Sequence, residues 1–252
     1  MSETNLSNKK PNILCLSSDL LKIIAAVAML IDHASFGILH AYLLNNAMSI
    51  LPQTYTKLNN LYEYGRSIGR LAMPIFAFFI VEGFLRTSNI KKYLLRMFLF
   101  ALVSEVPFDL GLYNSFMYTD HQNILFTFSV GLLMLSTLKY LNESIVGLSK
   151  PVKELALICC VIAYADLTYV LKCDYSVKCI AFIAVIYFLK NHKEIRLLAG
   201  SAFLSWEKFA PISCLLLYFY NPEKKPRLKY FFYIFYPAHF LLIFLIYHAC
   251  FA

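Results

Sequence analysis

Apolar stretches of about twenty residues recur along this chain, and their length is the feature that most limits its fold. A helix needs roughly 20 predominantly apolar residues to cross a bilayer. Hydrophobic residues make up 60% of the chain and charged residues 15%, whereas soluble domains average about 45–50% and about 25%. The stretches occupy residues 20–42, 68–86, 92–111, 122–141, 153–171, 177–190, 197–220 and 230–250. We therefore predict an all-α polytopic transmembrane helix bundle with about eight membrane segments. Residues 1–18 would form a polar cytoplasmic tail, and residues 19–252 a single transmembrane domain.

Basic residues predict the orientation of the chain, because cytoplasmic loops of membrane proteins are enriched in Lys and Arg. The interval after the second stretch is basic, whereas residues 111–121 carry no Lys or Arg. The basic residues of that interval are Arg86, Lys91, Lys92 and Arg96. This contrast predicts a cytoplasmic N-terminus. The formal net charge of +8 lies in such short intervals, so it indicates membrane lipid, and not nucleic acid, as the partner.

The stretch at 197–220 is interrupted by Trp206-Glu207-Lys208. The interval that follows is basic, with Lys224, Lys225, Arg227 and Lys229. A full crossing at 197–220 would place this interval on the outer side, against the rule for basic loops. Two half-helices that enter and leave on the inner side resolve the conflict, and membranes tolerate such segments where protein covers the backbone. We predict a re-entrant or broken segment at 197–220.

The first stretch carries Lys22, Asp32 and His33. An ionisable side chain in the hydrocarbon core costs about 2.5–3.5 kcal/mol on insertion scales, so it indicates a partner, a wet cavity or a function. Lys22 and His33 share one helix face, roughly 16 Å apart along the axis. Asp32 is turned about 100° from His33 and should pair with another helix. His33 is either a structural core histidine or part of a functional site, and Asp32 beside it favours the second.

Residues 45–66 are predicted as an outer loop with a short surface helix. Arg66 and Arg70, four residues apart, share a face if their segment is helical. They either reach toward the headgroups or line a polar cavity. Glu82 and Arg86 have the same spacing, which favours an ion pair between them.

Glu105 and Asp109 are four residues apart on the third stretch, so both carboxylates are predicted to face the bundle interior. Pro107 between them bends the helix. Asp120 is predicted to cap the next helix, whereas capping leaves His121 unexplained.

The last stretch places His239 two residues after Pro237, with Tyr236 nearby. This histidine either makes a hydrogen bond that compensates for the helix interruption at the proline, or it belongs to a polar site. No metal site is predicted, because the chain has no His-Glu-x-x-His motif and its histidines are far apart in sequence.

Five segments together resemble the TraX family of bacterial membrane proteins. They are residues 21–33, which end in Ile-Asp-His; 69–78, Gly-Arg-Leu-Ala-Met-Pro-Ile-Phe-Ala-Phe; 104–109, Ser-Glu-Val-Pro-Phe-Asp; 123–127, Asn-Ile-Leu-Phe-Thr; and 231–239, which contain Tyr-Pro-Ala-His. The family is named for a conjugation protein that acetylates the N-terminal amine of pilin subunits. The resemblance therefore implies an N-acetyltransferase of the bacterial inner membrane that uses acetyl-CoA as donor.

The resemblance also implies roles for the ionisable residues. His33 would deprotonate the acceptor, because imidazole is mostly neutral at cytoplasmic pH. The other catalytic candidates are Asp32, Glu105 and His239. Candidates for contacting the acceptor and the developing oxyanion are Arg66, Arg70, Asp109, His121, Asn123 and Tyr236. Candidates for holding the donor are Lys22, Arg86, Lys91, Lys92 and Arg96.

Two other functions stay open from the sequence. Buried acids and histidines also suit a proton-coupled transporter of small molecules. A non-catalytic assembly protein is the third possibility. The sequence identifies neither the acceptor, which is a protein, a peptide or a small molecule, nor the oligomeric state.

Overall fold

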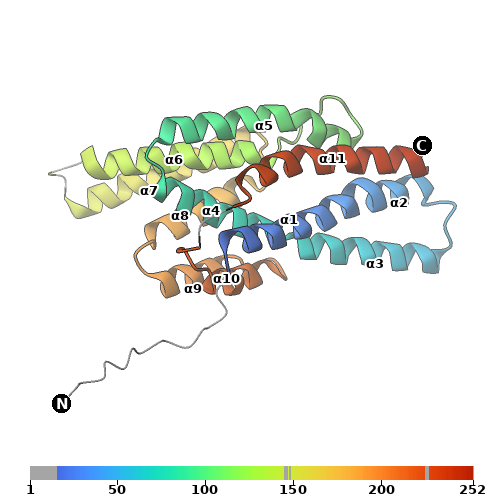
Figure 1. Ribbon diagram of the computed structural model, residues 1–252, viewed down its shortest axis with the longest axis horizontal. Helices are drawn as coiled ribbons and strands as arrows, with labels where there is room; N and C mark the ends of the chain where they lie inside the picture. The colour runs from blue at the N-terminus through green and yellow to red at the C-terminus, as the bar shows by residue number, and fades with distance from the viewer. Residues whose placement is uncertain (1–15, 145–146, 148, 225–226, 252) are drawn as a thin grey trace, which may run out of the picture.

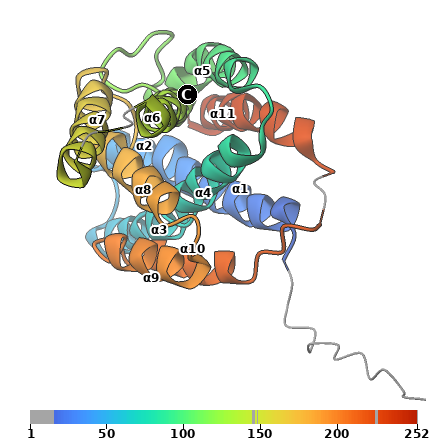
Figure 2. The same ribbon diagram turned by 90° about the vertical axis from the view of Figure 1, so that its left-hand side faces the viewer.

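The predicted all-α fold is confirmed. A computed structural model describes residues 16–144, 147, 149–224 and 227–251, so most of the predicted tail at 1–18 lies outside the described residues. The helices are α1 (Ser18–Ala34), the π-helix η1 (Ser35–His40), α2 (Ala41–Asn46), α3 (Pro52–Gly69), α4 (Ala72–Arg86), α5 (Ile90–Tyr113), α6 (Ile124–Ser144), α7 (Lys150–Val170), α8 (Ser176–Phe188), α9 (Lys193–Phe203), α10 (Ala210–Tyr218) and α11 (Lys229–Phe251). Figure 1 shows the long helices lying roughly along one axis, and Figure 2 shows the same bundle from one end.

Within the part of the chain that the structure describes, four helical segments are long and apolar enough to cross a membrane by length and composition. They are Ser18–Asn46, Pro52–Arg86, Ile124–Ser144 and Tyr230–Cys250. The chain is therefore a membrane protein with several candidate spans. The predicted number of about eight membrane segments is not tested by these four and stays a prediction.

One end of the bundle gathers segments that are far apart in sequence. The Leu16 amide donates to the Phe219 carbonyl at 2.8 Å, and the Asn221 amide donates to the Leu16 carbonyl at 2.9 Å. The Asp19 carboxylate accepts a hydrogen bond from the Arg227 amide at 2.6 Å. These bonds hold the start of α1, the end of α10 and the approach to α11 together.

The interrupted stretch at 197–220 is a hairpin of two short helices, as predicted. α9 has 11 residues and α10 has 9, so each is at most about 17 Å long, too short to cross a bilayer core of about 30 Å. Figure 2 shows the two helices side by side. Their turn contacts the middle of the bundle, because Glu207 lies 3.5 Å from the Arg70 guanidinium.

Residues 52–69 form a longer helix than the predicted short surface helix. α3 packs along α1 and η1 and leads through Arg70 and Leu71 into α4 (Figure 1). Close packing depends on two glycines four residues apart, a spacing that lets helices in membranes approach each other. A Cβ atom added at Gly65 would overlap the Ser35 side chain, and one added at Gly69 would overlap Asp32.

We expect Gly69→Ala to destabilise the protein by about 1–3 kcal/mol, the usual cost of overpacking. The overlapped atoms belong to the base of the Asp32 side chain and have little room to move. The measurement is the midpoint temperature of unfolding in detergent, with Asn60→Ala on the exposed face of α3 as control. A higher midpoint for Gly69→Ala would contradict close packing, because helix propensity alone favours alanine by about 1 kcal/mol.

Candidate active site

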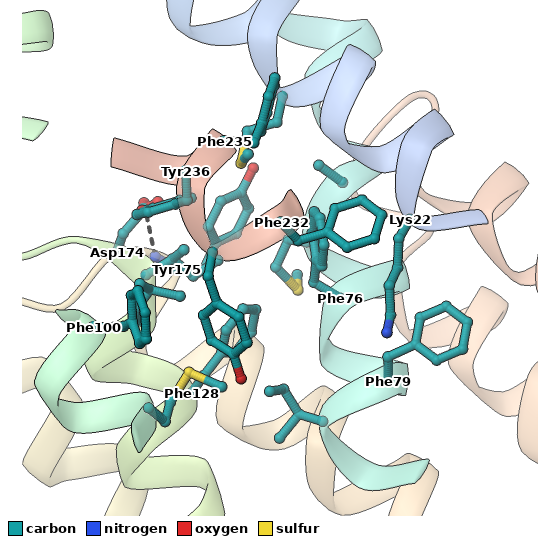
Figure 3. Close-up of a pocket in the computed structure, with 18 of the residues that line it drawn as sticks. Lys22, Phe76, Phe79, Phe100, Phe128, Asp174, Tyr175, Phe232, Phe235 and Tyr236 are labelled. Atoms are coloured by element: carbon teal, nitrogen blue, oxygen red, sulfur yellow. Dashed lines mark hydrogen bonds between the residues drawn. The ribbon is translucent and has the colours of Figure 1, made fainter. Parts of the chain in front are cut away.

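A cavity of about 220 Å³ lies inside the bundle between α1, α4, α5, α6 and α11. Aromatic rings form a large part of its wall: Phe76, Phe79, Phe100, Phe128, Phe232 and Phe235 all line it (Figure 3). The loop between α7 and α8 closes one side with Asp174 and Tyr175. The cavity is therefore apolar along its length, and polar side chains enter it at a few points.

The two ends of the cavity differ in charge and in access. At one end the half-buried Lys22 ammonium lies 4.8 Å from the centre of the Phe79 ring and 5.8 Å from that of Phe232. At the other end Asp32 and His33 are buried, with 5% and 9% of their surface exposed. Figure 3 shows Lys22 and Asp174 on opposite sides of the cavity. The geometry therefore favours entry from the Lys22 end.

Two histidines, His33 of α1 and His239 of α11, meet beside the cavity. His33 Nδ1 lies 2.8 Å from His239 Nε2, and His239 Nδ1 lies 3.0 Å from the Phe235 carbonyl oxygen. A carbonyl only accepts, so His239 Nδ1 carries the proton and its Nε2 is the acceptor in the neutral ring. His33 therefore donates through Nδ1 and keeps its lone pair on Nε2. The arrangement fixes the tautomer that a general base requires.

Asp32 pairs with another helix, as its angular position predicts. Its carboxylate lies 2.8 Å from the Arg66 guanidinium of α3, and the guanidinium also lies over the Phe36 ring at 5.3 Å. Among the described residues, no hydrogen bond joins the Asp32 carboxylate to the imidazole of His33 or His239. It lines the cavity as a charged wall beside His33.

Asp174 and Tyr175, which the sequence did not single out, bring the α7–α8 loop to the cavity. Arg70 Nη1 donates to the Tyr175 hydroxyl at 2.9 Å. Tyr175 has a left-handed backbone, with φ of 54°, an uncommon conformation for a bulky residue. Burial raises the pKa of the Asp174 carboxyl, and the Arg66 guanidinium offsets part of that rise. In the sequence, the one signal that could have pointed to this loop was an acidic residue, Asp174, between two apolar stretches.

Glu105 and Asn123 face the bundle interior, but neither lines the cavity. Glu105 accepts hydrogen bonds from the Asn123 amide at 3.1 Å and from its side chain at 2.5 Å. The Asn123 side chain also donates to the Ala101 carbonyl and accepts from the Leu125 amide. These contacts cap the start of α6. Their predicted catalytic and oxyanion roles are untested, and the contacts show a structural role.

Asp109, Asp120 and His121 hold the loop between α5 and α6. Asp109 accepts a hydrogen bond from the Tyr118 amide at 2.8 Å, and the exposed His121 ring stacks on Tyr113. The predicted cap at Asp120 is wrong, because Asn123 caps α6 and Asp120 instead lies 2.5 Å from the Lys172 ammonium. None of the three acid or imidazole side chains lines the cavity.

The predicted donor-binding cations are divided among three places. Lys22 lines the cavity, and Arg96 interacts electrostatically with Tyr93 and Tyr233 at its wall. Lys91 and Lys92 are exposed. Arg86 forms the predicted ion pair with Glu82, at 2.6 Å, and lines a separate hollow.

No group of three His, Cys, Asp or Glu side chains within the described ranges is arranged to hold a metal ion. The polar side chains at the cavity include a histidine pair, the two carboxylates Asp32 and Asp174, and the hydroxyls of Tyr175 and Tyr236.

The fold and the cavity define a helical membrane protein with an internal aromatic cavity that ends at a histidine pair. A family model described as TraX protein matches residues 17–247, so the chain belongs to the TraX family. The chain is also 27% identical over 253 residues to the probable fimbrial assembly protein FimC, serogroup H1, of Dichelobacter nodosus; the match covers 88% of this chain and 92% of that protein. No solved structure matches the chain significantly.

We expect Arg66→Gln to destabilise the protein more than Asp32→Asn. The first change leaves a buried carboxylate without its cation, whereas Arg66 is 24% exposed and can still reach water after the second. Removing one partner of a fully buried pair costs about 3–5 kcal/mol, and the exposure of Arg66 should reduce this to about 2 kcal/mol. The measurement is unfolding of both single variants and the double variant. Additive losses would contradict a direct pair.

Proposed function

We propose that the chain is an acyltransferase of the bacterial inner membrane that moves an acetyl group from acetyl-CoA to an amine acceptor. The observation that carries the proposal is the hydrogen bond from His33 to His239, because it leaves the lone pair on Nε2 of His33, a residue that lines the cavity. The N-terminus lies in the cytoplasm, where acetyl-CoA is made.

The donor enters by the Lys22 end. The aromatic wall suits a slender, uncharged arm such as acetyl-pantetheine, and the cavity of about 220 Å³ has no basic cluster inside it for a nucleotide. Lys22 and Arg96 stand near the accessible end and suit the donor's phosphates. About 15 Å of α1 separates Lys22 from Asp32, so the acetyl group would reach the histidine pair.

The acceptor amine is held at the buried end. The carboxylates of Asp32 and Asp174 attract an ammonium group and align it beside His33. The bound ammonium first gives one proton to one of these carboxylates, which later releases it to solvent, so that a neutral amine is formed. His33 Nε2 then takes a second proton as the amine nitrogen forms its bond to the acetyl carbonyl carbon. The carbon–sulfur bond then breaks, and the proton passes from the imidazolium to the departing thiolate, so the products are an amide and free coenzyme A.

Tyr175 is the donor we assign to the developing oxyanion. Its hydroxyl oxygen accepts a hydrogen bond from Arg70 at 2.9 Å, so its own proton is free to point into the cavity. Hydrogen bonds from a polarised hydroxyl stabilise an oxyanion more than they stabilise the uncharged carbonyl. Asn123, an oxyanion candidate from the sequence, already donates the protons of its side-chain amide to Glu105 and Ala101.

Membership in the TraX family supports acetyl transfer to a protein amine. The relative from Dichelobacter nodosus is named a probable fimbrial assembly protein, and this name supports a fimbrial or pilin-like acceptor. The free N-terminus of such a protein is an amine of the kind the two carboxylates attract.

We expect His33→Ala to lose acetyl transfer by about 10²–10⁴-fold, the usual contribution of a general base, while acetyl-CoA still binds. The assay follows free coenzyme A released from acetyl-CoA by purified protein and a mixture of short peptides with free N-termini. The same peptides with acetylated N-termini are the control. Calorimetry measures donor binding separately.

Wild-type protein that is folded yet neither binds acetyl-CoA nor releases coenzyme A would overturn the proposal. Substrate flux into liposomes under a proton gradient, without consumption of acetyl-CoA, would favour the transporter instead. Full transfer by His33→Ala would leave an acyltransferase but remove His33 from its chemistry.

His239 is a positioning residue in this proposal, and its role has its own test. His239→Phe removes the acceptor that fixes the His33 tautomer, so we expect kcat to fall about tenfold or more with KM for acetyl-CoA unchanged. His239→Gln keeps an acceptor oxygen near the former Nε2 position and should restore part of the loss. Equal kcat for the two variants would show that the ring only fills space.

A further inference from the structure

A second hollow, of about 370 Å³, lies between the ends of α4, α8 and α10 and the start of α9. Four basic side chains line it: Arg86, Lys190, Lys193 and Arg196. A single carboxylate, Glu82, lies among them. Four positive charges against one negative charge leave three in excess at this place.

The arginines of the hollow are already arranged by Glu82. Arg86 Nη2 lies 2.6 Å from one Glu82 carboxylate oxygen, and Arg196 Nη1 lies 3.1 Å from the other. Arg196 is 7% exposed and its guanidinium lies 4.7 Å above the Phe78 ring. This stacking fixes the plane of the guanidinium and limits its movement.

One N–H donor of these arginines takes no part in the pairing with Glu82. Arg196 Nε is buried and has no hydrogen-bond partner among the described residues. Buried donors in folded proteins are nearly always paired. A nearly buried arginine with a spare N–H, on the wall of a basic hollow, has the chemistry of an incomplete anion site.

The hollow is distinct from the aromatic cavity. The two share no lining residue, because α4 presents Phe76 and Phe79 to the cavity and Phe78, Glu82 and Arg86 to the hollow. Aromatic rings separate them: Tyr220 lines the hollow and packs edge to face on Phe79. An anion in the hollow would therefore lie outside the cavity and its histidine pair.

We propose that this hollow binds a phosphate group, either the headgroup of an anionic phospholipid or a soluble phosphate. The three excess positive charges suit a phosphate oxyanion, and arginine and lysine side chains are the usual partners of phosphate. Phe78, Leu85 and Leu217 on the wall suit a ligand that also has an apolar part. The hollow lies at the end of the bundle where the starts of α1 and α11 meet, the end predicted to face anionic lipid.

The test uses full-length protein in an uncharged detergent and two probes: dihexanoyl phosphatidylglycerol and inorganic pyrophosphate, at ionic strength matched with sodium chloride. The readout is the rise in the midpoint temperature of unfolding with probe concentration, which needs no acyl transfer. Lys190→Gln/Lys193→Gln removes two cations that are not fully buried and leaves the Glu82 pairs intact. Lys150→Gln/Lys153→Gln removes two cations from the start of α7 and is the matched control.

We expect saturable stabilisation of the wild type and of the control, with the apparent Kd weakened about tenfold or more in Lys190→Gln/Lys193→Gln. Stabilisation by phosphatidylglycerol alone identifies a lipid headgroup, and stabilisation by pyrophosphate identifies a soluble phosphate. Absence of saturable stabilisation by both probes, or equal weakening in both double variants, would overturn the site. Either result leaves the proposed acyl transfer untouched, because neither probe carries an acyl thioester.

Discussion

A carboxylate buried in an apolar helix needs a cation, and the pairing of Asp32 with Arg66 meets that need by binding α1 to α3. The pairing requires close helices, which Gly65 and Gly69 permit. α3 then ends beside the cavity and delivers Arg70 to Tyr175. The loop of Tyr175 is anchored in turn, because Thr127 of α6 donates to the Asp174 carbonyl at 2.6 Å. The buried carboxylate of Asp32 thus begins a series of contacts that connects α1, α3, the α7–α8 loop and α6 around the cavity.

The histidine centre differs from one in which a carboxylate orients a histidine. His33 is oriented by a second neutral imidazole, and that imidazole by a backbone carbonyl. Such a chain adds no charge to the apolar interior, so orienting His33 requires no carboxylate in contact with the base, whose burial would cost desolvation free energy. Among the described residues that line the cavity, the negative charge comes from Asp32 and Asp174, and arginines partly compensate both. The centre is therefore suited to a reaction in which a proton moves briefly and returns.

The sequence predicted the helices well and the contacts between distant segments poorly. Apolar length alone located α5, α6, α7 and α11 to within a few residues, because the bilayer sets that length. Helical spacing also predicted the Glu82–Arg86 pair and the need of Asp32 for another helix. It did not identify Tyr175, because its partner Arg70 is 105 residues away. The π-helical turn of η1, directly after His33, also left no signal in the apolar pattern.

Arg86 illustrates why charge near a membrane surface is difficult to assign from sequence. Its place in a basic interval grouped it with Lys91, Lys92 and Arg96, yet it faces away from the cavity on α4. A helix turns by about 100° per residue. Phe79 and Arg86 are seven residues apart, so in an ideal helix their side chains point in directions only about 20° apart. Small deviations from ideal geometry then decide which space each side chain lines. Here the ion pair between Arg86 and Glu82 determines the side that Arg86 lines. Glu82 also pairs with Arg196 of α9, and this second pair draws Arg86 toward the hairpin. The α9–α10 hairpin therefore does more than fill space beside α4, because it supplies Arg196, the second arginine that pairs with Glu82 in the basic hollow.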